Sequence, residues 1–165
     1  MAKQPTKVAK KSTKKKTTRK STAKPATAKL TAEQEAKLEA EFKKSTARID
    51  RTDVKYALDK TLSKAEELLK SSSEWIVGLG RQAKMLFTML KSWWSEEYDL
   101  PWGTVAAITT ALLYFVNPID LVPDFIPLIG FLDDLAIIAI CVKAIQADLR
   151  KYAEAKNIDL KALGL

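Results

Sequence analysis

Four aspartates lie close together in the segment from 117 to 135, which reads NPIDLVPDFIPLIGFLDDL. Grouped carboxylate oxygens suit Mg²⁺, Mn²⁺ or Ca²⁺, and the candidate metal ligands are Asp120, Asp124, Asp133 and Asp134. The alternative is that these carboxylates only cap helix N-termini, where backbone N–H groups lack partners. The chain contains no histidine, which excludes a Ser-His-Asp triad, a Cys-His pair and the usual zinc ligand sets. We therefore expect no catalytic residue and a non-enzymatic protein, with a divalent cation such as Mg²⁺ as cofactor only in the metal-binding alternative.

Prolines give the same segment its shape. Asn117 followed by Pro118 is typical of an N-cap and a first helical residue. Pro123 and Pro127 each end a short turn because proline cannot continue a helix, and Gly130 allows the chain to change direction. The segment is predicted to form a rigid corner between two apolar helices.

The stretch YFVNPIDLVPDFIPLIGFLDDLAII resembles the signature of the YkvA-like family, the domain of unknown function numbered 1232. The family pattern is approximately Y-x-x-S-P-I-D-L-I-P-D-F-I-P-x-x-G-x-x-D-D, and Asn117 replaces its usual serine. The resemblance covers roughly residues 84–152. It implies a small helical domain, often found in bacterial proteins predicted to be membrane-associated, without an established activity.

The rest of the ordered chain is predicted to be all-α. A capping box of Thr31 and Gln34 begins a charged amphipathic helix that extends to about Lys70, and a second box of Ser71 and Glu74 follows a break at residues 71–73. A fold-back at this break would form an antiparallel helical hairpin. The helix carries an apolar seam, which also suits coiled-coil-like packing and an oligomer formed through residues 31–70; the seam contains Leu38, Phe42, Ile49, Tyr56, Leu58, Leu62, Ala65 and Leu69.

The next predicted helix, from Glu74 to about Tyr98, has a broad apolar side. Such a stripe ordinarily faces a protein core. The alternative is a helix in a membrane interface, where aromatic side chains enter the lipid boundary. All four tryptophans lie between residues 75 and 102, and the candidate interface residues are Trp75, Phe87, Trp93, Trp94 and Trp102.

Residues 100–119 contain no charged side chain before Asp120. A helix of twenty residues, at about 1.5 Å each, matches the thickness of a bilayer's hydrocarbon core, about 30 Å. Three arrangements therefore remain open for this segment: a single membrane crossing, a re-entrant hairpin and a hairpin buried in a soluble core. Asp99 is a candidate cap for this helix. The last helix, predicted from about Phe131 to Ala155, has too short an apolar run to cross. Its Cys141 is expected to be a buried, inert thiol.

The N-terminus differs sharply from the rest of the chain. Residues 1–29 hold eleven of the 28 basic residues, which leaves 17 basic residues against 20 acidic ones, a net charge of −3, in residues 30–165. The tail has little to bury, so we expect disorder, and it is predicted to bind polyanions such as DNA, RNA or anionic lipid, unless it only aids solubility. The candidate residues are Lys10, Lys11, Lys14, Lys15, Lys16, Arg19 and Lys20.

Four parts follow from these patterns: a disordered tail (1–30), a charged amphipathic helix (31–72), a YkvA-like helical domain (73–156) and a short C-terminal tail (157–165). The function predicted is a membrane-associated, non-enzymatic helical protein with a polyanion-binding tail on the cytoplasmic side. The alternatives are a soluble helical domain that binds a divalent metal or small ligand at its aspartates, and a nucleoid-type DNA-binding protein.

Overall fold

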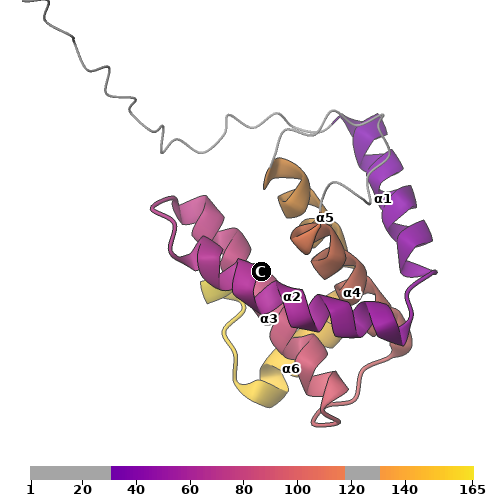
Figure 1. Cartoon of the computed structure of the whole chain (residues 1–165), viewed down its shortest axis with the longest axis vertical. Helices are drawn as coiled ribbons and strands as arrows, with labels where there is room; N and C mark the ends of the chain where they lie inside the picture. Colours follow the sequence, from indigo (N-terminus) through magenta and orange to yellow (C-terminus); the bar gives the residue numbers. More distant parts are fainter. Residues whose placement is uncertain (1–30, 118–130) are drawn as a thin grey trace, which may run out of the picture.

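The computed structural model describes residues 31–117 and 131–165. Over these residues the chain forms helices and no strand, so the predicted all-α class is confirmed (Figure 1). The elements are α1 (Ala32–Thr46), α2 (Arg51–Leu69), α3 (Glu74–Trp94), α4 (Trp102–Val116), α5 (Phe131–Ala144), α6 (Gln146–Lys156) and the 3-10 helix η1 (Lys161–Leu163).

The core is built around α4. Eleven of its 15 residues are buried, and it contacts α1, α2, α3 and α5. Two of its buried hydroxyls are satisfied inside the helix: Thr109 Oγ1 donates to the Val105 carbonyl at 2.8 Å and Thr110 Oγ1 to the Ala106 carbonyl at 2.9 Å. The uncharged segment therefore forms a core helix. Over the described residues, no helix combines the length and the apolar character that a bilayer crossing requires.

The single charged helix predicted up to about Lys70 is wrong, since α1 and α2 are separate helices. A capping box that the sequence reading missed begins α2: Asp50 Oδ1 accepts from the backbone N–H of Asp53 at 3.0 Å, and Asp53 Oδ2 accepts from that of Asp50 at 3.0 Å. The predicted box of Thr31 and Gln34 at the start of α1 is confirmed. The break lets α1 pack on α4 and α5 while α2 packs on α3 and α4. Leu38 and Phe42 are thereby buried within the chain, Tyr56 is exposed, and an oligomer through this region stays a prediction.

The helices α2 and α3 form an antiparallel hairpin, the arrangement that a fold-back at residues 71–73 would give. Their contact is close at Gly80, where a Cβ atom would lie 3.1 Å from the Ala65 carbonyl oxygen and 3.1 Å from Leu68 Cβ. The predicted capping box of Ser71 and Glu74 is wrong. Ser73 is the N-cap of α3 and has no side-chain cap bond, while the Ser71 hydroxyl accepts from the Ser73 N–H at 3.2 Å.

The helices α4 and α5 also run antiparallel. Cys141 on α5 donates to the Ala107 carbonyl at 3.5 Å, and further along the chain Asp148 on α6 accepts a hydrogen bond from the Thr104 hydroxyl near the start of α4. The predicted start at Phe131 is confirmed. The prediction of one helix to Ala155 is wrong, because Ile145, with φ −104° and ψ 12°, separates α5 from α6.

Two more local predictions need correction. Pro101 and not Asp99 is the N-cap residue of α4. Residues 157–165 do not form a simple tail, because η1 packs on α3 and Gln82 donates to the carbonyl of Gly164 at 3.2 Å.

We expect Gly80→Ala to be less stable than Gly78→Ala by about 1–3 kcal/mol, the usual cost of overpacking a tight contact. Both changes gain the same helix propensity, but a methyl group at Gly78 meets nothing within 4 Å. Urea unfolding followed by circular dichroism measures both free energies. Equal stabilities would show that α2 and α3 do not approach as described.

Candidate functional site

Three tryptophans from two helices meet at one end of the bundle. The ring centroid of Trp93 lies 6.3 Å from that of Trp94 and 5.9 Å from that of Trp102. The Arg51 guanidinium, at the start of α2, lies 5.7 Å from the centroid of Trp93, within cation–π range. Trp94 is 42% exposed and Trp102 47% exposed. We name Arg51, Trp93, Trp94 and Trp102 the tryptophan corner.

A hollow of about 440 Å³ adjoins the tryptophan corner. This volume lies in the range of small-molecule sites, about 300–1,000 Å³. Half of the lining residues are aromatic and half are charged; they are Arg51, Trp93, Trp94, Glu96, Tyr98 and Asp99. Aromatic faces and carboxylates attract cations, whereas a guanidinium binds phosphate or carboxylate.

The backbone at the rim of the hollow is strained. At the end of α3, the N–H of Glu97 donates to the Ser92 carbonyl at 2.9 Å and that of Glu96 to the Trp93 carbonyl at 3.1 Å, the pattern of a Schellman motif. Glu96 occupies its left-handed position with φ 61°, where glycine is usual and a side chain costs about 1–2 kcal/mol.

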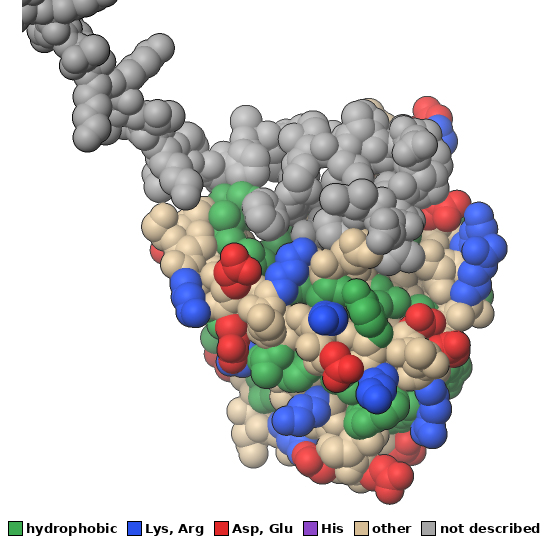
Figure 2. All heavy atoms as spheres, viewed as in Figure 1, with side chains coloured by type: hydrophobic (Ala, Val, Ile, Leu, Met, Phe, Trp, Pro, Cys, Tyr) green, Lys and Arg blue, Asp and Glu red, His purple; other side chains and the backbone are tan. Residues whose placement is uncertain are grey.

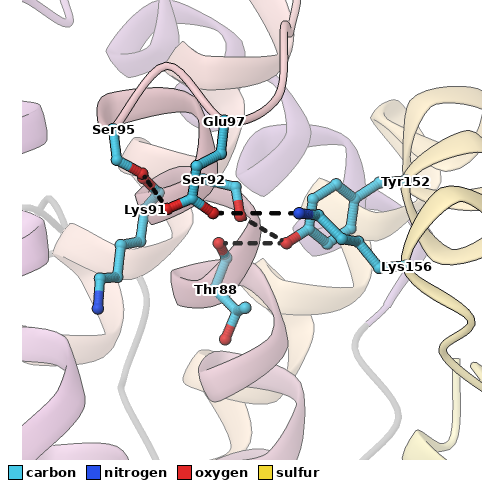
Figure 3. A network of polar contacts seen from close by, with 7 residues as sticks. All are labelled: Thr88, Lys91, Ser92, Ser95, Glu97, Tyr152 and Lys156. Atoms are coloured by element: carbon cyan, nitrogen blue, oxygen red, sulfur yellow. Dashed lines mark hydrogen bonds and ion pairs between the residues drawn. The ribbon is translucent and has the colours of Figure 1, made fainter.

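A polar network links α6 to the end of α3 and to the connector that follows it (Figure 3). The buried hydroxyls of Ser92 and Tyr152 lie 2.8 Å apart, and the Tyr152 hydroxyl also donates to the Thr88 carbonyl at 3.4 Å. The ring of Tyr98 meets that of Tyr152 edge to face, with centroids 4.9 Å apart. Tyr152 therefore links α6 to α3 and supports one wall of the hollow.

The five residues predicted to lie in a membrane interface differ in location and in exposure. It brings Trp93, Trp94 and Trp102 together at the tryptophan corner. Phe87 is 8% exposed, so its prediction as an interface residue is wrong. It is buried because neighbouring elements cover α3 on several sides. Trp75 is half-buried at the opposite end of α3.

The other predicted sites lie mostly outside the described residues. This holds for the candidate ligands Asp120 and Asp124, for Pro118, Pro123, Pro127 and Gly130, and for the tail residues Lys10, Lys11, Lys14, Lys15, Lys16, Arg19 and Lys20. Asp133 and Asp134 belong to the first turn of α5, but the structure does not describe their side chains. Asn117 is the C-cap of α4. No metal-holding group of three His, Cys, Asp or Glu occurs among the described side chains, and the aspartate site stays a prediction.

Cys141 is fully buried, as predicted, and burial raises the pKa of its thiol well above the ordinary value. Lys64 of α2 donates to the carbonyl of Phe115 in the last turn of α4, with its Nζ 4.9 Å from the Phe115 ring centroid. It supplies the positive charge that the end of α4 lacks.

The sequence reading missed four residues of the hollow: Arg51, Glu96, Tyr98 and Asp99. For three of them a signal existed, since WWSEEYDLPW places acids and a tyrosine between tryptophans. Arg51 carried no such signal, because its position follows from how α2 and α3 pair.

Residues 104–140 match the family described as protein of unknown function, DUF1232. The predicted resemblance to this family is confirmed over these residues. The chain is distantly homologous to the "Uncharacterized membrane protein YkvA" of Bacillus subtilis (strain 168), with 36% identity over 67 residues, which is 40% of this chain and 63% of the relative. The match thus spans less than two thirds of that relative's length. No solved structure matches.

We expect the Ser92 and Tyr152 hydroxyls to be coupled. Tyr152→Phe leaves Ser92 Oγ, in a residue 6% exposed, without its tyrosine partner and lowers the free energy of unfolding by about 1 kcal/mol. In the Tyr152→Phe background, Ser92→Ala should lower the free energy of unfolding by less than it does in the unmodified protein. The difference, the coupling energy of the two hydroxyls, should be about 0.5–1.5 kcal/mol. The exposed Ser95→Ala is the control, and additive effects in the double variant would argue against the bond.

Proposed function

We propose that the protein is a non-enzymatic, membrane-associated helical protein that places its tryptophan corner in the interface of a membrane. Its basic N-terminal tail binds the anionic lipids of the same membrane, on the cytoplasmic side. The exposed, clustered indoles are the observation that carries this proposal.

The tryptophan corner has the chemistry of an interfacial anchor. Indole rings prefer the boundary between lipid and water, because one part is apolar and the N–H is polar. Trp94 and Trp102 are, together with Tyr56, the exposed large hydrophobic side chains of the described residues. Two of the three, Trp94 and Trp102, lie beside the same ring, that of Trp93, at one end of the bundle. Placing them in an interface removes this apolar surface from water.

The basic N-terminal tail supplies a second contribution to membrane binding, its electrostatic attraction to anionic lipids. Small interfacial anchors bind stably when an apolar contact is combined with a basic segment. The bundle itself does not offer a uniform basic surface on the face that Figure 2 presents, where acidic and basic side chains are interspersed with small hydrophobic areas. Residues 1–29 hold eleven positive charges, and each is worth about 1 kcal/mol near an anionic leaflet. Such leaflets face the cytoplasm, which supports the proposed side.

Two further observations support the proposal. The distant homologue bears the name of a membrane protein. The chain has no histidine, the commonest general base in enzymes, and no serine, threonine or cysteine is among the described residues that line the hollow beside the tryptophan corner. A binding role fits these residues better than catalysis.

We expect the full-length protein to sediment with vesicles of equal parts phosphatidylcholine and phosphatidylglycerol. Changing both Trp94 and Trp102 to serine should weaken this binding about tenfold or more, because each indole contributes about 1–2 kcal/mol when it leaves water. Tyr56→Ser is the matched control, since Tyr56 is 47% exposed, as is Trp102. Equal binding by the double variant and the control would refute the role of the tryptophan corner.

The tail makes a separate prediction. A full-length variant with Lys10, Lys11, Lys14, Lys15, Lys16, Arg19 and Lys20 changed to glutamine should bind phosphatidylglycerol vesicles about as weakly as phosphatidylcholine vesicles, and this binding should depend much less on salt. Its binding to pure phosphatidylcholine vesicles should not change. A variant that loses binding to random duplex DNA but keeps its affinity for anionic vesicles would show that the tail serves nucleic acid instead.

A further inference from the structure

The hollow beside the tryptophan corner combines two opposite kinds of receptor. Its lining includes the rings of Trp94 and Tyr98 and the carboxylates of Glu96 and Asp99, and it also includes the guanidinium of Arg51. The lining is too highly charged for an acyl chain. It suits a small polar ligand that carries both a cation and an anion.

The cation-binding side is available to a ligand. Glu96 and Asp99 are exposed, and among the described residues neither forms an ion pair, whereas the neighbouring Glu97 pairs with Lys156. Arg51 lies over the ring of Trp93, which also lines the hollow, at 5.7 Å, so one indole of the hollow already holds a cation. Aromatic faces with carboxylates nearby are the usual receptor for quaternary ammonium groups.

The anion-binding side is equally available. Within the described part of the chain, Arg51 has no carboxylate partner. Its contact with the Trp93 ring leaves the N–H groups at the guanidinium edge for a phosphate. The hollow therefore presents a phosphate receptor and an ammonium receptor within one volume of about 440 Å³.

The strained backbone at Glu96 is an independent observation. Glycine would be more stable at φ 61°, so the side chain is present at a cost to folding. Strain of this kind is concentrated at functional sites. A carboxylate held at this position extends the charged lining of the hollow.

We propose that the hollow binds a phosphocholine group, with the quaternary ammonium against Trp94, Tyr98 and the two carboxylates and the phosphate on Arg51. This rests on the proposed function in one respect: docking the tryptophan corner in an interface brings zwitterionic lipid headgroups to the hollow. The lipid headgroup is the source we infer, and free phosphocholine is the probe.

The test is tryptophan fluorescence of the full-length protein titrated separately with phosphocholine, choline and inorganic phosphate. We expect phosphocholine to bind about tenfold more tightly than either fragment, because it engages both receptors. Asp99→Asn and Arg51→Gln should each weaken phosphocholine binding about five- to tenfold. Glu97→Gln, in the same connector but outside the hollow, should leave it unchanged.

Glu96→Gly separates binding from a structural role. It should raise the midpoint of thermal unfolding, because glycine suits the left-handed position, and at the same time weaken phosphocholine binding about five- to tenfold. A variant that is more stable and binds equally well would overturn the proposed role of Glu96.

Phosphatidylcholine vesicles distinguish this inference from the proposed function. If vesicles bind but saturating phosphocholine neither changes the fluorescence nor competes, the inference fails and the membrane role stands. If phosphocholine binds but no vesicle does, the site stands and the membrane role fails. Binding of phosphate alone with the same affinity as phosphocholine would also overturn the inference.

Discussion

The rest of the structure depends on the need to cover α4. This helix carries no charged residue and buries 11 of its 15 positions, so nearly every side of it must meet another element. The helices α1, α2, α3 and α5 supply that cover, and each does so with its own apolar stripe. Polar groups at the contact surfaces are paired: the Thr46 hydroxyl on α1 donates to Thr110 Oγ1 at 3.2 Å, and Lys64 on α2 donates to the Phe115 carbonyl. Thr109 and Thr110 are tolerated within the buried helix because their hydroxyls bond to carbonyls of the same helix.

Covering α4 also brings the candidate site together. Since α2 and α3 are antiparallel and the connector 95–101 returns the chain to α4, the start of α2, the end of α3 and the start of α4 meet at one end. Arg51, Trp93 and Trp102 are neighbours for this reason. The network of Ser92, Tyr152 and Tyr98 then fixes α6 behind the connector. The exposed indoles consequently rest on a packed support, and a rigid aromatic surface loses little conformational entropy when it binds.

The sequence was a good guide wherever local chemistry decides the structure. The all-α class, the capping box at Thr31, the break after α2, the burial of Cys141 and the family resemblance of residues 104–140 all follow from composition, spacing or motif. The sequence was a poor guide where tertiary contacts determine which side chains are buried and which residues become neighbours. Phe87 and Trp94 look alike as aromatic residues of one helix, yet only the packing of α2, α4 and α5 around α3 determines that one is buried and the other exposed. The break at Asp50 was missed because its aspartates read as ordinary surface charges. Arg51 was missed because nothing in the sequence of α2 indicates that this residue contacts Trp93.

The tryptophan corner lies at the start of α4, outside the residues that match DUF1232. The matched residues 104–140 begin after Trp102 and exclude residues 51 and 93–99, whereas the aspartate segment follows Asn117 at the other end. A helix of 15 residues is about 22 Å long, so a group bound at one end does not touch the other. The two ends can therefore serve separate purposes. Exposed indoles and a glutamate in a left-handed conformation both reduce stability, and both occur in or beside the one hollow that adjoins the tryptophan corner. Two such costs at one place, on an otherwise well-packed scaffold, are easier to explain by binding than by folding.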